Sequence, residues 1–199
     1  MRLRAGRVLT FDIECRPTAW IGGDFVGRSI TAFAAKWLGD PDEAIICNVL
    51  TREDTNVFRI VEPLAAMLEE ATVCVGHYIR GFDLPVISGD LERVFEAPLP
   101  RLVTVDTKID RISTSGISES LDNLVTRYEL EHPKEHMREP MWEEHNLWQT
   151  PRSVEWVRAR VCSDVLATEE LYLTLEDYGR LKSPKVWDPT SGKMPSYRR

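Results

Sequence analysis

Two acidic side chains, Asp12 and Glu14, lie two residues apart at the end of the apolar segment formed by residues 7–13. This segment is rich in β-branched and aromatic residues, which predicts a β-strand. Side chains alternate along a strand, so both carboxylates point to the same face. Side by side they repel each other and lose hydration, and raised pKa values, basic partners or a divalent cation must offset that cost. The alternative is that the strand ends here and both acids are solvated.

Two further acids occur at junctions that can bring them to the same place. Asp83 follows a predicted strand and opens a predicted helix, and Asp164 falls on the inward face of the last predicted helix. Each has an ordinary alternative role, Asp83 as the N-cap of its helix and Asp164 as the ion-pair partner of Arg160 one turn earlier. Four acids that meet at one edge of a sheet form an all-oxygen site for two divalent cations, Mg²⁺ or Mn²⁺, as used in phosphoryl transfer.

Strand and helix patterns supply the elements that would position these acids. The predicted strands cover residues 7–13, 29–38, 43–50, 72–76 and 102–106. The predicted helices cover residues 56–70, 82–95, 118–128 and 150–178, and residues 129–149 read as irregular or partly helical. Three strands followed by strands that alternate with helices predict an α/β fold: a mixed five-stranded sheet, with one antiparallel strand, flanked by helices.

Length and charge narrow the class of protein. The 199 residues, 43% of them hydrophobic, fit one globular domain and exclude a polymerase or a helicase. The net charge is −7, but residues 180–199 hold six basic residues against one acid, a net +5, which leaves −12 for the rest. We therefore predict a single domain over residues 1–178 and a basic tail over residues 179–199 that suits a nucleic-acid partner.

The sequence gives no sign of a membrane segment or of disulfide bonds. No apolar stretch approaches the ~20 residues that cross a bilayer. The four cysteines, Cys15, Cys47, Cys74 and Cys162, have neither the spacing of zinc ligands nor that of a redox pair. We expect a reduced, cytoplasmic protein with no membrane partner and no disulfide-linked partner.

The order and context of the four acids resemble the DEDD (DnaQ-like) 3′–5′ exonucleases, a family with a ribonuclease H-like fold. The three family motifs are matched in order by Asp12-Ile13-Glu14, by Gly76-His77-Tyr78 with Phe82-Asp83-Leu84-Pro85, and by Asp164-Val165 with Thr168. Between them, Ser120-Leu121-Asp122 and Lys134 resemble the family's Ser-Leu-Asp helix and the lysine that follows it. The similarity covers residues 7–178 and is to stand-alone exonucleases of bacteriophages and to the exonuclease domains of family B polymerases.

This resemblance implies a role for each site residue. Asp12, Glu14 and Asp164 would hold the catalytic cation, and Asp12 with Asp83 would help to place a second one. The residues that would contact the substrate, chiefly its 3′-terminal nucleotide, are Cys15, His77, Phe82, Lys134 and Arg160. An aromatic side chain that stacks on a base tolerates any sequence, which suits an exonuclease.

One departure from the family concerns the residue that orients the attacking water. The family carries a Tyr four residues before the last Asp or a His five residues before it, and this chain has Arg160 and Ala159 there. Three interpretations follow. Another side chain takes the role, with His136 preferred over Lys134, His132 and His145; or the cations suffice and activity is reduced; or the protein is inactive. For His136 the alternative is an ordinary surface histidine.

The resemblance therefore implies a metal-dependent 3′–5′ exonuclease that releases nucleoside 5′-monophosphates from the 3′ end of single-stranded DNA. An RNA-trimming exonuclease is the alternative within the enzyme class, because discrimination of the 2′-OH depends on pocket shape. The alternative from another class is an inactive module of this fold that binds DNA or a DNA polymerase in trans. The compartment would be the cytoplasm of a bacterial or phage-infected bacterial cell. The plainest alternative is an α/β domain in which the motifs occur by chance.

Overall fold

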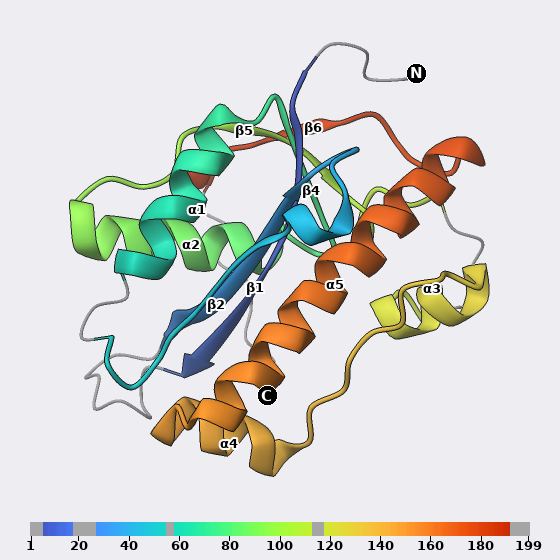
Figure 1. Cartoon of the computed structure of the whole chain (residues 1–199). Coiled ribbons are helices and arrows are strands. Elements are labelled where there is room, and N and C mark those ends of the chain that lie inside the picture. The colour runs from blue at the N-terminus through green and yellow to red at the C-terminus, as the bar shows by residue number, and fades with distance from the viewer. Residues whose placement is uncertain (1–5, 18–26, 55–57, 113–117, 192–199) are drawn as a thin grey trace.

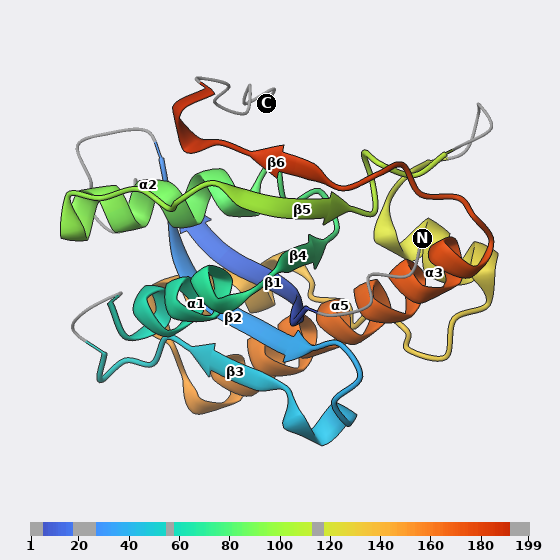
Figure 2. The same cartoon turned by 90° about the horizontal axis from the view of Figure 1, so that it is seen from above.

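A computed structural model describes residues 6–17, 27–54, 58–112 and 118–191 (Figure 1). Its sheet has six strands in the order β3-β2-β1-β4-β5-β6, an order that Figure 2 shows from one edge to the other. The strands are β1 Val8–Pro17, β2 Arg28–Trp37, β3 Ile46–Val49, β4 Val73–Gly76, β5 Leu102–Asp106 and β6 Lys185–Trp187. The α-helices are α1 Phe58–Glu70, α2 Asp83–Phe95, α3 Leu121–Tyr128, α4 Glu139–Trp148 and α5 Pro151–Asp177. The predicted mixed α/β fold is confirmed.

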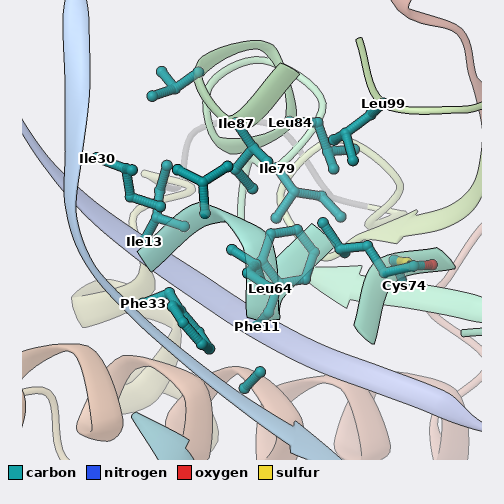
Figure 3. Close-up of a cluster of buried hydrophobic side chains, with 14 of the residues drawn as sticks. Phe11, Ile13, Ile30, Phe33, Leu64, Cys74, Ile79, Leu84, Ile87 and Leu99 are labelled. Carbon is teal, nitrogen blue, oxygen red and sulfur yellow. The ribbon is translucent and has the colours of Figure 1, made fainter. Parts of the chain in front are cut away.

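Strand β1 is central, because it pairs antiparallel with β2 and parallel with β4. Its alternation separates two faces. Leu9, Phe11 and Ile13 are buried against α1 and α2, where Figure 3 shows Phe11 and Ile13 among the side chains of the main core. Asp12 and Glu14 point to the other face, and a register shift between Glu14 and Cys15 interrupts the pairing with β2, which continues from Cys15 to Pro17. The apolar half of β1 therefore fixes the direction of its acidic half.

Helix α5 covers the face of the sheet opposite α1 and α2 (Figures 1 and 2). The helix begins as predicted, with Pro151 in the first turn and the Thr150 side chain accepting a hydrogen bond from the backbone N–H of Ser153 at 3.3 Å. Its valines at 157, 161 and 165 pack on two alanines of β2, Ala32 and Ala34, in a second core. Small residues on the strand let the helix approach closely. Among the described residues, no helix is both long and apolar enough to cross a membrane.

The prediction of five strands with one antiparallel strand is wrong. Lys185–Trp187, assigned to the basic tail, form β6, which pairs antiparallel with β5 at the sheet edge. Two strands therefore run opposite to the rest of the sheet: β2 is antiparallel to β1, and β6 is antiparallel to β5. A three-residue strand is too short to show alternation, and only its buried Trp187 carries a signal. Three basic residues of the predicted tail, Lys193, Arg198 and Arg199, lie outside the described residues.

A chain of charged side chains ties the segment before α4 to the sheet. Lys36 of β2 is buried and contacts Glu169 of α5 at 2.8 Å and Asp42 at 3.3 Å. His132 lies between Asp42 and Glu170, with its two ring nitrogens 3.2 and 2.9 Å from their carboxylate oxygens. Burial lowers the pKa of His132, but the hydrogen bonds to Glu170 and Asp42 outweigh it and hold the pKa above its ordinary value.

We expect His132→Gln to lower stability in acid and to have no effect in alkali. The raised pKa means that the charged imidazole stabilises the fold fully below its ordinary pKa, and that this contribution is lost as the pH rises through the folded-state pKa. Since the side chain is partly exposed, the effect should be at most about 1 kcal/mol. Urea unfolding from pH 5 to 9 measures it, with His136→Gln, a 75% exposed side chain, as the control. A difference that grows with pH would contradict the assignment.

Candidate metal centre

Three of the four predicted acids form a compact cluster between β1 and α5. Asp12, Glu14 and Asp164 each present a carboxylate oxygen, and these atoms lie within 4.8 Å of one another. Asp164 is buried because the valine stripe of α5 turns this side of the helix to the sheet. Asp12 and Glu14 meet it because they share one face of β1. Carboxylates at this spacing match the oxygen ligands that hard divalent cations take.

Asp83 lies beside this cluster and is bound to the backbone of β1. It is the first residue of α2, is buried, and its Oδ1 accepts a hydrogen bond from the backbone N–H of Ile13 at 3.3 Å. The N-cap of α2 is Phe82, whose side chain makes no capping bond. Asp83 is thus attached to the strand that carries Asp12 and Glu14, and its charge contributes to the raised pKa of Asp12.

The four carboxylates are costly to ionise where they lie. Withdrawal from water is the main cause of a raised pKa in every case, and it takes the pKa of Glu14 to about 7 and that of Asp83 to about 8. The pKa of Asp12 is raised well above its usual range by this desolvation and by the charges of Asp164, Asp83 and Glu14. The pKa of Asp164 is raised in the same direction. A divalent cation would remove this cost.

Two basic side chains offset part of the negative charge. Arg160 places its Nε 3.3 Å from Glu14 and its Nη2 3.2 Å from Asp164, and Lys134 places its Nζ 3.2 Å from the same Oδ2 atom of Asp164. The predicted ion pair between Arg160 and Asp164 is therefore present, together with a second contact to Glu14. The other oxygen of Asp164, Oδ1, is buried and has no hydrogen-bond partner among the described residues. An unpaired buried carboxylate oxygen fits a cation ligand.

Three residues predicted to contact substrate, Cys15, His77 and Phe82, are close in sequence to Glu14 or Asp83. His77 shares a hydrogen bond with the Thr107 hydroxyl at 3.0 Å, and burial lowers its pKa to about 4, so it is neutral at pH 7. Burial raises the pKa of the Cys15 thiol to about 12, which leaves the thiol protonated. Arg28 joins Cys15 to Phe82, since its Nη1 lies 3.6 Å from the sulfur and its guanidinium 5.2 Å from the ring centroid. These groups are suited to contact and not to acid–base work.

The histidines considered for proton transfer lie elsewhere. His136 is 75% exposed and its Nε2 is 3.8 Å from Asp122, on α3. His132 belongs to the charged chain with Asp42 and Glu170 described above. His145 is fully buried in α4, and burial lowers its pKa to about 4. Position 160 holds the guanidinium that bridges Glu14 and Asp164.

Sequence reasoning missed two residues that shape the loop between β4 and α2. Asp106, at the end of β5, is fully buried and accepts hydrogen bonds from the backbone N–H groups of Tyr78 and Arg80 at 3.0 and 3.1 Å. Tyr78 has φ of 72°, a left-handed conformation that is uncommon outside glycine. Its ring lies so close over Gly81 that a Cβ there would be 2.5 Å away. An acid at the last position of a predicted strand was the available signal for Asp106, whereas the conformation of Tyr78 has none.

Comparison with known proteins gives a fold likeness and nothing closer. The sequence matches no family model and no curated protein. Its structure is similar to that of the family B DNA polymerase from the hyperthermophilic archaeon Pyrobaculum calidifontis, with a TM-score of 0.62 and 19% sequence identity. The similarity covers 87% of this chain and 25% of the polymerase, so the chain spans about a quarter of that protein's length. At this identity the likeness concerns the fold.

We expect Asp12→Asn to stabilise the metal-free protein and to weaken metal binding. The amide removes one of the repelling charges, and a gain of about 1 kcal/mol corresponds to roughly 2–4 °C in Tm for a protein of this size. Thermal unfolding in chelator and then in Mn²⁺ separates the two effects, since a bound cation raises Tm. Asp40→Asn, at an exposed turn residue, is the control. A metal-induced rise in Tm equal to that of the unaltered protein would show that Asp12 is no ligand.

Proposed function

We propose that this chain is a metal-dependent 3′–5′ exonuclease of the ribonuclease H-like fold. It would hydrolyse phosphodiester bonds at the 3′ end of single-stranded DNA and release nucleoside 5′-monophosphates. The observation that carries the proposal is the meeting of Asp12, Glu14 and Asp164 from distant elements, with Asp83 alongside. The likeness of the fold to a DNA polymerase is consistent with it.

The residues present fit two divalent cations, Mg²⁺ or Mn²⁺. Asp12, Glu14 and Asp164 would hold one, and Asp12 with Asp83 would help to hold the second. Such ions activate a water molecule and stabilise the leaving oxygen in phosphodiester hydrolysis. The protein's own contribution is to fix the carboxylates by the packing of β1 and α5, so that no reorganisation is needed when a strand end arrives.

The remaining side chains would bind and orient the strand end. Phe82 and the neutral His77 would contact the sugar or the base of the last nucleotide, and Cys15 would lie beside them. Lys134 is well placed to meet a phosphate, because its ammonium group already lies at Asp164 on the rim of the acidic cluster. Tyr78 adds a 39% exposed ring on the same loop as His77, a suitable surface for stacking.

Arg160 favours a second candidate, an inactive module that binds DNA or a polymerase. Its guanidinium spans Glu14 and Asp164 and supplies charge that a cation would otherwise supply. The same guanidinium is also suited to bind a phosphate once cations occupy the carboxylates. His136 is the proposed substitute for the missing Tyr or His, and it must move from Asp122 to the cluster to act, as loops at active sites do.

We expect 5′-labelled single-stranded DNA to be shortened from its 3′ end in Mg²⁺ or Mn²⁺ and to stay intact in chelator. Asp164→Asn should abolish the activity, because it removes a carboxylate ligand from a fold that can tolerate the amide. Released products should be nucleoside 5′-monophosphates. RNA of the same sequence tests the alternative substrate. If the protein binds DNA but degrades neither the DNA nor the RNA substrate in Mg²⁺ or Mn²⁺, the result would support the inactive module instead.

We expect Arg160→Tyr to have a higher turnover number than Arg160→Gln, because of the two only tyrosine restores a group that can orient the attacking water. A positioned proton acceptor contributes about 10²–10⁴-fold in other enzymes, so a gain of tenfold or more is expected. Both variants lose the guanidinium, so both should bind Mn²⁺ more tightly in a calorimetric titration. Equal rates for the two variants would indicate that His136 or another group already fills the role.

A further inference from the structure

A hollow lies at the carboxyl ends of α3 and α5, away from the acidic cluster. Its volume is about 350 Å³ and its lining residues are Arg111, Ile112, Arg127, Tyr128, Tyr178 and Arg180. Asp164 and Tyr178 are 14 residues apart, which places the two sites about 20 Å apart along α5. Three arginines and two tyrosines in one hollow stand out in a chain of net charge −7.

Arg111 holds the floor of this hollow in place. Its side chain is buried, its Nε donates to Glu119 at 2.8 Å, and it also hydrogen-bonds the Tyr128 side chain. Its charge is therefore balanced within the protein. Tyr128 is fixed by this contact, and its ring centroid lies 6.2 Å from that of Tyr178. Tyr178 is 65% exposed, so it offers a ring backed by a second, fixed ring.

Arg127 and Arg180 supply free positive charge at the rim. Both are exposed, and among the described residues neither forms an ion pair with a carboxylate. The Arg127 guanidinium lies 5.8 Å from the Tyr128 ring centroid. Guanidinium groups recognise phosphate through paired N–H donors, and aromatic rings stack on bases regardless of sequence. The hollow thus offers guanidinium groups for the phosphate of a nucleotide and an aromatic ring for its base.

Helix α3 connects this hollow to the acidic cluster. Asp122, in its first turn, lies 3.8 Å from Nε2 of His136, two residues after Lys134, whose Nζ lies 3.2 Å from Asp164. Arg127 and Tyr128, in its last turn, line the hollow. The helix packs along the carboxyl-terminal half of α5 through Leu124 and its neighbours (Figure 1). A single strand of DNA that lies along α3 would therefore reach from one site to the other.

We propose that this hollow binds a nucleotide of a single strand on the 5′ side of the end held at the acidic cluster. Its base would stack on Tyr178, and its phosphate would lie between Arg127 and Arg180. The inference rests on the proposed function, because the acidic cluster is taken to hold the 3′ end. Contact at both sites would make the protein bind DNA strands that are long enough to reach both sites more tightly than shorter ones.

The test is the affinity of the full-length protein, carrying Asp164→Asn so that no strand is cut, for fluorescent oligodeoxythymidines of about 2 to 16 nucleotides, measured by anisotropy in Mn²⁺. Affinity should rise once the strand spans both sites. Arg127→Gln with Arg180→Gln should remove this rise, and should reduce the slope of log Kd against log salt by about 1.4, the value for two phosphate contacts on a single strand. Tyr178→Ala should weaken the long strands about tenfold, and Tyr178→Phe should restore them.

The matched control is Arg59→Gln with Arg101→Gln, which removes the same charge from side chains that are 82% and 73% exposed elsewhere. An equal loss in this control, or no loss in the first double variant, would overturn the inference. A hollow that bound thymidine monophosphate as tightly as the long strand would also overturn it. If DNA is degraded and the hollow makes no contribution to binding, the proposed function stands and this inference fails. If binding depends on strand length through the hollow but no DNA is degraded, the inference about the hollow stands and the proposed function fails.

Discussion

Asp12 and Glu14 on β1 face Asp164 on α5 across the gap between sheet and helix, and their repulsion is a cost that the rest of the fold must bear. Desolvation raises the pKa of all three, so the cluster opposes folding when its charges are present. The compensating free energy comes from apolar packing on both sides of β1: the core beneath Phe11, and the valines of α5 on Ala32 and Ala34 of β2. The site is stable because its scaffold is.

Helix α5 does more than carry one acid, because it also positions the two basic side chains at the cluster. Arg160 reaches Glu14 as well as Asp164. Glu170 accepts hydrogen bonds from the backbone N–H groups of Glu131 and His132, which anchors the segment that brings Lys134 to Asp164. The basic side chains of Lys134 and Arg160, which offset the acidic charge, are therefore positioned by the same helix that supplies Asp164. Displacing α5 would disturb both at once.

The sequence was sufficient to predict an element and the direction of its side chains where hydrophobic residues repeat at a regular period or where a capping residue marks the start of a helix. The period of two on β1 put Asp12 and Glu14 on one face, and the valine stripe of α5 turned Asp164 inward. It was insufficient where tertiary contact decides. Lys185–Trp187 form a strand only because the β5 edge is available to them. No local propensity explains the left-handed conformation of Tyr78, which depends on Asp106, distant in sequence.

Asp106 and Asp164 show how two buried aspartates can have opposite meanings. Asp106 accepts hydrogen bonds from four backbone N–H groups, those of Tyr78, Arg80, Lys108 and Ile109, so its charge is satisfied within the protein. It fixes the loop that leads into Asp83, and is a structural residue. Asp164 leaves Oδ1 without a partner among the described residues and depends on side-chain cations at its other oxygen. Both side chains are buried carboxyl groups. The supply of donors distinguishes the acid that builds the site from the acid that is prepared for a ligand.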